Sequence, residues 1–393
     1  MEFRFEYEPG TIRYGKHCVT KLGEELERLE ADRALVITGQ TVGATDTVMN
    51  PIREGLGERL VSTFAETTPE KTLPTALRGA KRVAETGADA LVAVGGGSSL
   101  DITKIIAAVA DTDRTDEEII QTFEETGSVP IADGELRPIV AVPTTLAGAD
   151  LSMIGGVTLR REGLIRGGVH DPRLMPDALW YDPELFRTTP HDVLCASAMN
   201  GFDKAIETVY ADTATPITDG TAVRALGYLS DGLPRLGSGE WNDSTMRDVV
   251  LGTILAQYGC SRVDGLTLSL IHAFGHGIAR GYNIQQGGAH GIIAPHALAY
   301  LFGSVDGKRT LLADGLGVEA ESRDATADAV IEAVENVRDA LGLPTRLREI
   351  DDMVRSDLPS IAADVYDDGL MPYCPSGLDP TIEELEDVLS EAW

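Results

Sequence analysis

The chain has 393 residues, of which 43% are hydrophobic, enough for two domains that each bury a core. It carries 63 acidic and 33 basic residues, and only seven of the basic residues are lysines. The acidic residues are scattered, which favours adaptation to high salt over an acidic docking face for a basic partner. The chain shows no basic footprint for nucleic acid and no apolar run of the kind found in signal peptides or membrane spans. We therefore expect a cytoplasmic protein that binds neither nucleic acid nor membranes.

The first half of the chain alternates short β-rich runs with amphipathic stretches. Strands are predicted at residues 33–38, 59–64, 88–94, 138–142 and 178–181, with a β-hairpin over residues 155–168. This alternation is typical of βαβ units and predicts a parallel sheet with helices on both faces. Residues 1–187 are thus expected to form an α/β nucleotide-binding domain.

The character of the sequence changes after Asp182. Thr189 and Pro190 are interpreted as the N-cap and the first-turn proline of a helix. Long helical periodicities then follow at residues 192–210, 218–229, 244–262, 266–279, 289–301 and 325–341. Residues 188–393 are expected to form an all-α substrate and catalytic domain.

A glycine-rich turn, Gly95–Gly97 followed by Ser98, lies between a predicted buried strand and a predicted helix. Glycines in this place let backbone N–H groups approach a phosphate, and the helix N-terminus adds favourable partial charge. The alternative is a tight turn without a ligand, and the spacing does not match the ordinary GxGxxG fingerprint. A second loop, with Thr144 and Thr145, follows the next strand and offers two hydroxyl groups to a phosphate or ribose.

These motifs resemble the iron-containing alcohol dehydrogenase family, which shares its fold with glycerol dehydrogenase and dehydroquinate synthase. GGGSSLDITK at residues 95–104 is similar to the phosphate loop of that family, and PTT at residues 143–145 to its second nucleotide segment. Within the family, residues 143–158 and 197–211 are most similar to the maleylacetate reductase branch. The resemblance implies a Rossmann-like domain with NADP or NAD bound by Gly39, Gly95, Gly96, Gly97, Ser98, Asp101, Lys104, Thr144 and Thr145.

The resemblance also places four residues on the metal-ligand positions of the family. Aligning the segment Ala205–Glu207 puts Asn200 on an aspartate and Lys204 on a histidine, while Gln286 stands at another histidine position and only His272 is retained. An ammonium group repels a cation, so an iron or zinc ion is not expected here. Lys204 is expected to polarise the substrate carbonyl in place of the metal. The alternative is that Lys204 only pairs with a nearby carboxylate such as Asp203, Asp150 or Glu207.

His272 and His276 are four residues apart on one predicted helical face. The resemblance places His276 near the nicotinamide and the substrate, where it is expected to relay a proton; the alternative is a pair of packing histidines. His290 resembles a further histidine of the maleylacetate reductase branch, and His296 is expected to cap or pack. Gly39 replaces an aspartate of NAD-preferring members, which predicts that NADPH is used at least as well as NADH.

The expected activity is hydride transfer between NAD(P)H and a small alcohol, aldehyde or oxo acid, as in a maleylacetate reductase-like enzyme. One alternative is a cyclase similar to dehydroquinate synthase, and another is a non-catalytic nucleotide-binding relative. The resemblance further implies a homodimer paired through an N-terminal strand, for which residues 3–7 are the candidates.

Overall fold

The computed structural model describes residues 3–161 and 163–393, which divide into two compact units. The α/β unit comprises residues 7–145 and 149–189. The helical unit comprises residues 3–6, 146–148 and 190–393. Within the described ranges, no helix is both long enough and apolar enough to cross a membrane.

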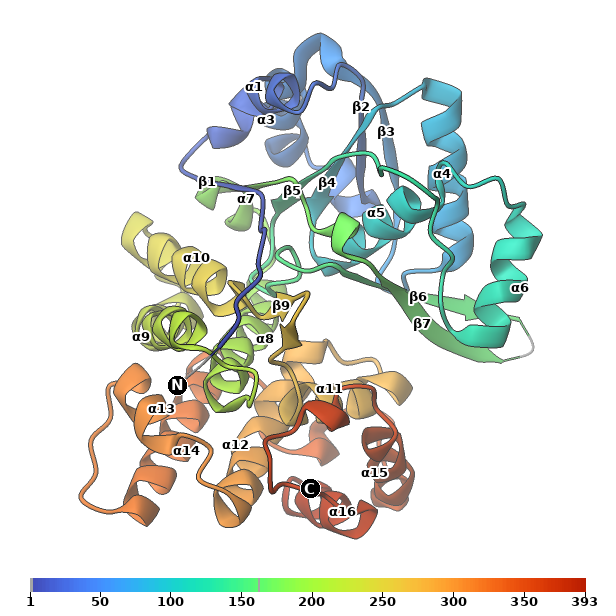
Figure 1. Cartoon of the computed structure of the whole chain (residues 1–393). Helices are drawn as coiled ribbons and strands as arrows, with labels where there is room; N and C mark the ends of the chain where they lie inside the picture. The colour runs from blue at the N-terminus through green and yellow to red at the C-terminus, as the bar shows by residue number, and fades with distance from the viewer. Residues whose placement is uncertain (1–2, 162) are drawn as a thin grey trace. The chain divides into compact units, whose positions relative to one another are not determined.

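The α/β unit is built on a parallel six-stranded sheet with the order β1-β8-β5-β4-β2-β3 (Figure 1). Its strands are β1 (Thr11–Tyr14), β2 (Ala34–Gly39), β3 (Leu60–Thr67), β4 (Ala90–Gly95), β5 (Ile139–Pro143) and β8 (Ala178–Tyr181). A separate antiparallel hairpin consists of β6 (Ile154–Arg160) and β7 (Leu164–His170). The helices are α1 (Leu22–Arg28), α2 (Gln40–Gly43), α3 (Asp46–Leu56), α4 (Leu73–Thr86), α5 (Gly97–Val109), α6 (Asp116–Thr126) and α7 (Pro183–Phe186).

Alternate residues of the central strands enter two different cores because successive side chains of a strand point to opposite faces. On β2, Leu35 and Ile37 join the core that contains residues of α4, α5 and α6. Ala34 and Val36 join the core that contains residues of α1 and α3. Figure 1 shows these two groups of helices on opposite sides of the sheet. The predicted parallel sheet with helices on both faces is confirmed.

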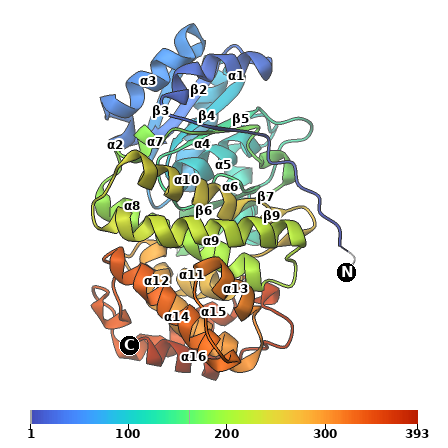
Figure 2. The same ribbon diagram turned by 90° about the vertical axis from the view of Figure 1, so that its left-hand side faces the viewer.

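The helical unit contains the second half of the chain, and Figure 2 shows its longest helix, α9, lengthwise. Its helices are α8 (His191–Tyr210), α9 (Pro216–Gly237), α10 (Asp243–Gln257), α11 (Leu270–Gly281), α12 (Gln286–Ser304), α13 (Arg309–Leu316), α14 (Arg323–Ala340), α15 (Leu358–Tyr366) and α16 (Ile382–Glu391). The helical character predicted for residues 188–393 is confirmed.

Three local predictions in this unit are wrong. The helix expected over residues 244–262 ends at Gln257, because Gly259 has a positive φ of 80° and turns the chain into the short hairpin β9 (Ser261–Arg262) and β10 (Gly265–Leu266). The next helix accordingly begins at Leu270 instead of residue 266. At the start of α8, Pro190 itself occupies the N-cap. Thr189 instead donates its hydroxyl to the Thr144 carbonyl at 2.7 Å.

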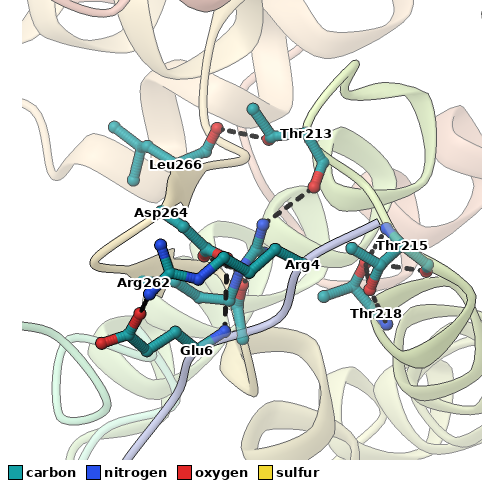
Figure 3. Close-up of polar contacts among 9 residues, drawn as sticks. Arg4, Glu6, Thr213, Thr215, Thr218, Arg262, Asp264 and Leu266 are labelled. Atoms are coloured by element: carbon teal, nitrogen blue, oxygen red, sulfur yellow. Dashed lines mark hydrogen bonds and ion pairs between the residues drawn. The ribbon is translucent and has the colours of Figure 1, made fainter. Parts of the chain in front are cut away.

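The N-terminal residues 3–6 lie against the β9–β10 hairpin within the helical unit (Figure 3). The Glu6 backbone N–H donates to Asp264 Oδ2 at 3.2 Å. The buried Arg262 guanidinium donates to Asp264 at 2.9 Å and to the Thr213 carbonyl at 2.9 Å. Residues 3–10 form no strand within the chain as the structure describes it, since β1 starts at Thr11. The homodimer paired through residues 3–7 therefore stays a prediction.

Gly201 on α8 allows the segment 146–148 to pack against this helix. A Cβ atom at Gly201 would lie 2.4 Å from the Leu146 carbonyl oxygen. We expect Gly201→Ala to lower the free energy of unfolding by about 1–3 kcal/mol, because the contact must open.

The matched control is Gly220→Ala in the exposed interior of α9, where nothing lies within 4 Å of the added atom. Here the free energy of unfolding should rise by about 0.5–1 kcal/mol, since alanine favours the helix. Urea denaturation of both variants measures the difference, and equal effects would contradict the packing argument.

Candidate active site

The glycine-rich turn joins the end of β4 to the start of α5. Gly95 ends the strand with a φ of 137°, and a Cβ atom there would lie 2.9 Å from Ser99 Oγ, so the turn requires glycine. Gly96 is the N-cap of α5, and Gly97 is its first residue. The first backbone N–H groups of this 13-residue helix lack intrahelical acceptors and can bind a phosphate group. The strand–turn–helix context predicted for residues 95–98 is present.

The two threonine residues of the second loop lie beside this turn. Strands β4 and β5 are neighbours in a register that pairs Gly95 with Pro143. The Thr144 N–H donates to the Gly95 carbonyl at 3.0 Å, and a Cβ atom at Gly96 would lie 3.1 Å from Thr145 Cγ2. The structure thus brings together two loops that are about fifty residues apart in the sequence.

Gly39 ends β2 at the same side of the sheet as Gly95 at the end of β4, because these two neighbouring strands are parallel. The other neighbour of β2 is β3, which is also parallel. The register partner of Gly39 on β3 is Thr67, whose hydroxyl hydrogen-bonds to Ser99 at 2.9 Å. Ser99 and Thr67 were not among the residues singled out from the sequence. Their only sequence signal was the proximity of Ser99 to the glycine turn.

Two further predicted cofactor residues, Asp101 and Lys104, are held by other parts of the α/β unit. Asp101 accepts a hydrogen bond from Lys71 Nζ at 2.8 Å, and this ion pair was not predicted. Lys104 is fully buried, and its Nζ donates to the carbonyl oxygens of Ala149 at 3.2 Å and Ile154 at 3.1 Å. Lys104 therefore ties the loop after β5 to the start of β6, next to the glycine-rich turn. Its role in contacting a nucleotide stays a prediction.

In the helical unit, Lys204 of α8 meets His272 of α11. Lys204 is only 8% exposed, and its Nζ lies 3.4 Å from His272 Nε2. The stem of Lys204 runs along Gly148, where a Cβ atom would lie 3.3 Å from Cδ of the lysine. No carboxylate in the described part of the chain forms an ion pair with Lys204, so the alternative that it only pairs with a nearby acid has no contact to support it.

Asn200 and Gln286, the other two positions singled out with Lys204, do not join this contact. Asn200 Oδ1 is buried and has no hydrogen-bond partner among the described residues. Gln286 is the first residue of α12. The structure thus brings together Lys204 and His272 and leaves the two amides outside their hydrogen bond.

Glu207, one turn after Lys204 on α8, holds the other nitrogen of the His272 ring. Its Oε2 lies 2.5 Å from His272 Nδ1, and both side chains are buried. Its Oε1 accepts four hydrogen bonds, three from backbone N–H groups around the start of α11 and one from the Tyr210 hydroxyl. Burial raises the pKa of Glu207, and these donors oppose that shift. In the sequence, Glu207 stands out only as the end of the aligned segment Ala205–Glu207 and as a possible partner of Lys204.

A second acid and imidazole lie buried beside this group. Oδ2 of Asp203 lies 3.1 Å from Nδ1 of His290, although neither atom has a hydrogen bond of good geometry to any described residue. The rings of His290 and His272 meet edge to face, with centroids 4.5 Å apart. Gly275 makes room for His290, because a Cβ atom there would lie 2.1 Å from the ring.

Burial shifts the pKa values of these groups. Burial and the nearby Glu207 raise the pKa of Asp203 well above its usual range, and the nearby Lys204 opposes that shift. Burial also lowers the pKa values of His272 and His290 well below the ordinary value, and both imidazoles are therefore neutral.

His276, predicted as the proton relay, is turned toward another partner. Its Nδ1 lies 3.1 Å from Asp368 Oδ2, and Arg280 donates to the same oxygen at 2.7 Å. Burial opposes the ionisation of Asp368, but the hydrogen bond and charge of His276, the Leu370 N–H and the nearby Arg280 together outweigh it, and the net pKa is lowered. The His276 side chain is 39% exposed, so it is accessible to solvent and to a ligand. Its role as a proton relay stays a prediction.

His296 lies away from these contacts on α12. Burial, with the nearby Arg346 and Arg338, lowers its pKa to about 4. This position agrees with a packing role.

Comparison with known proteins shows the family. Residues 9–183 match the model of the iron-containing alcohol dehydrogenase family, and residues 194–393 match the model of its C-terminal domain. A maleylacetate reductase of Pseudomonas aeruginosa is 28% identical over 325 residues, which cover 81% of this chain and 80% of that protein. An NAD-dependent methanol dehydrogenase of Bacillus methanolicus is 28% identical over 364 residues, covering 90% of this chain and 91% of that protein.

The fold of this chain is also similar to the folds of solved structures. The crystal structure of a 1,3-propanediol oxidoreductase superposes with a TM-score of 0.89 at 20% identity, with all of both chains covered. The fold and the matched models define an enzyme of the alcohol dehydrogenase and reductase class. The chain belongs to the iron-containing alcohol dehydrogenase family.

The iron that gives this family its name does not fit the residues of this chain. A divalent cation needs lone pairs on carboxylate or imidazole groups, and Lys204 offers only N–H donors. His272 Nε2, the ring nitrogen not bonded to Glu207, faces that ammonium group instead. Across residues 3–161 and 163–393, no three or more His, Cys, Asp or Glu side chains are grouped so that they could hold an ion.

The buried imidazoles make stability depend on pH. A histidine of the unfolded chain takes up a proton near pH 6.5, whereas His272 and His290 stay neutral in the folded chain. Below that pH the unfolded state binds more protons, so stability is full above pH 7 and falls on acidification. We expect a loss of about 1.4 kcal/mol per pH unit for each histidine between pH 6 and pH 5.

His290→Asn should make that slope shallower by about the contribution of one histidine. Denaturant unfolding at pH 7, 6 and 5 measures it for both proteins. Parallel slopes would show that His290 titrates alike in the folded and unfolded chains.

Proposed function

We propose that the protein is an NAD(P)H-dependent reductase of a small aldehyde or oxo acid that works without a divalent metal. The observation that carries this proposal is the 3.4 Å contact between Lys204 Nζ and His272 Nε2, in place of a cluster of metal ligands. Hydride adds to the carbonyl carbon, and the electron pair of the C=O bond moves to the oxygen. The Lys204 ammonium stabilises the alkoxide that forms, as a preorganised N–H donor.

The cofactor assignment is supported by the α/β unit. The turn at Gly95–Gly97 and the neighbouring Thr144 and Thr145 form a phosphate-binding edge of the kind that nucleotides occupy in parallel sheets. The methanol dehydrogenase relative is named as NAD-dependent. When bound, the nicotinamide supplies or accepts the hydride, and the chain itself supplies binding and electrostatics.

The substrate class follows from the relatives. Maleylacetate reductases support a small oxo acid, and the methanol dehydrogenase supports a small alcohol or aldehyde. These relatives are reductases and dehydrogenases, so the comparison does not favour a cyclase similar to dehydroquinate synthase.

The first test is NADPH oxidation by chelator-treated protein with maleylacetate and a panel of small aldehydes and ketones. Molar potassium chloride is used because the net charge of −30 indicates a protein adapted to high salt, and activity should fall at 0.1 M salt. We expect turnover without added metal. Activity that returns only with iron or zinc would refute the metal-free mechanism.

Lys204→Met keeps the length of the stem and removes the charge. We expect kcat to fall by about 10²–10³-fold, the usual loss for one oxyanion-stabilising donor. Lys81→Met, which removes an exposed lysine paired with Asp116 in the α/β unit, should leave kcat unchanged. Equal activity of the two variants would remove Lys204 from the mechanism.

The choice of cofactor is tested at Gly39. Its backbone is extended, with a φ of −79°, and an added Cβ atom would lie no closer than 3.4 Å to the Thr67 carbonyl oxygen, so a side chain fits. We expect kcat/KM with NADPH to equal or exceed that with NADH. Gly39→Asp should lower kcat/KM for NADPH about tenfold or more by repelling the 2′-phosphate. A hundredfold preference of the unaltered protein for NADH would contradict this prediction.

A further inference from the structure

The carboxylate of Glu207 caps the start of α11. Its Oε1 accepts from the backbone N–H groups of Ser269 at 3.3 Å, Ile271 at 2.8 Å and His272 at 3.2 Å, and from the Tyr210 hydroxyl at 3.0 Å. Backbone N–H groups can only donate, so this position must hold an oxygen with free lone pairs. A negative charge also suits a helix N-terminus, which carries partial positive charge.

The other oxygen of Glu207 determines which nitrogen of His272 carries the proton. In one arrangement, Glu207 is ionised and Nδ1–H donates to Oε2 across the 2.5 Å contact. In the other, a protonated Glu207 donates to Nδ1, and the proton of the ring is on Nε2. The second arrangement would point Nε2–H at the N–H donors of Lys204, 3.4 Å away. Only the first gives Lys204 an acceptor.

We infer that Glu207 is a positioning residue that keeps the proton of His272 on Nδ1, so that the Nε2 lone pair accepts a hydrogen bond from Lys204. This inference rests on the proposed function. An ammonium group has three N–H donors. One is fixed by His272, and the other two remain for the carbonyl oxygen of a substrate. The start of α11 fixes Glu207, Glu207 fixes the His272 ring, and the ring fixes the ammonium group of Lys204. We call this chain of hydrogen bonds the relay.

Glu207→Gln tests the relay because an amide has only one oxygen. It cannot accept hydrogen bonds both from the backbone N–H groups of α11 and from His272 Nδ1–H in the present geometry. The backbone donors of α11 require the amide oxygen at the Oε1 position, which leaves the NH₂ group facing His272 Nδ1. The imidazole must then accept at Nδ1 and carry its proton on Nε2. Lys204 would face a donor in place of an acceptor and lose its fixed orientation.

The experiment is two-bond ¹H–¹⁵N correlation NMR on the full chain labelled with ¹⁵N-imidazole histidine, with the His272 signals identified by their absence in His272→Gln. At neutral pH we expect the Nδ1–H tautomer for His272 in the unaltered protein. A proton on Nε2 in that protein would overturn the inference without any variant. The result therefore does not depend on whether Glu207→Gln folds.

In Glu207→Gln we expect the tautomer to change to Nε2–H and kcat to fall about 10–100-fold, with KM for NADPH unchanged. The matched control for the tautomer is Asp203→Asn, another buried acid-to-amide change on α8, which should leave the His272 proton on Nδ1. In the Lys204→Met background, Glu207→Gln should cause no further loss of kcat, because it acts through the lysine. An unchanged tautomer or an additive loss would refute the positioning role.

These outcomes are separable from the proposed function. Metal-free turnover combined with an Nε2–H tautomer would refute the relay and leave the reductase assignment intact. The expected tautomer in a protein that turns over no carbonyl would refute the reductase assignment instead.

Discussion

In the helical unit, one imidazole joins a buried ammonium group to a buried carboxylate, and the site depends on that link. An isolated buried charge costs several kcal/mol, and only good geometry with satisfied hydrogen bonds offsets this cost. The carboxylate of Glu207 receives donors from a helix N-terminus and a tyrosine, while Lys204 has the ring nitrogen of His272. Among the described residues, Lys204 is thus linked to Glu207 through an imidazole and not through a direct ion pair.

In the α/β unit, backbone geometry brings together the two loops that are predicted to bind the cofactor. Gly95 and Gly96 leave the space that Ser99 and Thr145 fill, and the register of β4 with β5 places both loops at one edge of the sheet. Such an edge exposes backbone N–H groups at the start of a helix, which bind phosphate whatever the sugar attached to it. Gly39, at the end of β2, is the residue at which we predict the choice between the two nicotinamide cofactors to be made.

Replacing a metal by lysine changes what the site can recognise. A divalent ion offers two positive charges and several coordination positions, so it can hold a substrate through two oxygen atoms. An ammonium group offers one charge and directed N–H donors. If the protein works without a metal, as proposed, its substrate gains its orientation from hydrogen bonds and shape. The family assignment alone does not predict this difference, because the matched models cover the chain irrespective of the ligand positions.

The sequence by itself determined the fold class, five of the six strands of the parallel sheet, and the strand–turn–helix context of residues 95–98, because these depend on local periodicity and on glycine spacing. It also identified Lys204 and His272 through family resemblance. Tertiary structure decided the rest. Glu207 caps a helix that starts 63 residues further along the chain, Lys71 reaches Asp101, and His276 turns to Asp368. The helical pattern was read as far as residue 262, whereas Gly259, with its positive φ, turns the chain out of the helix before that point. Contacts between distant segments depend on how the helices pack, and local propensity carries no information about that packing.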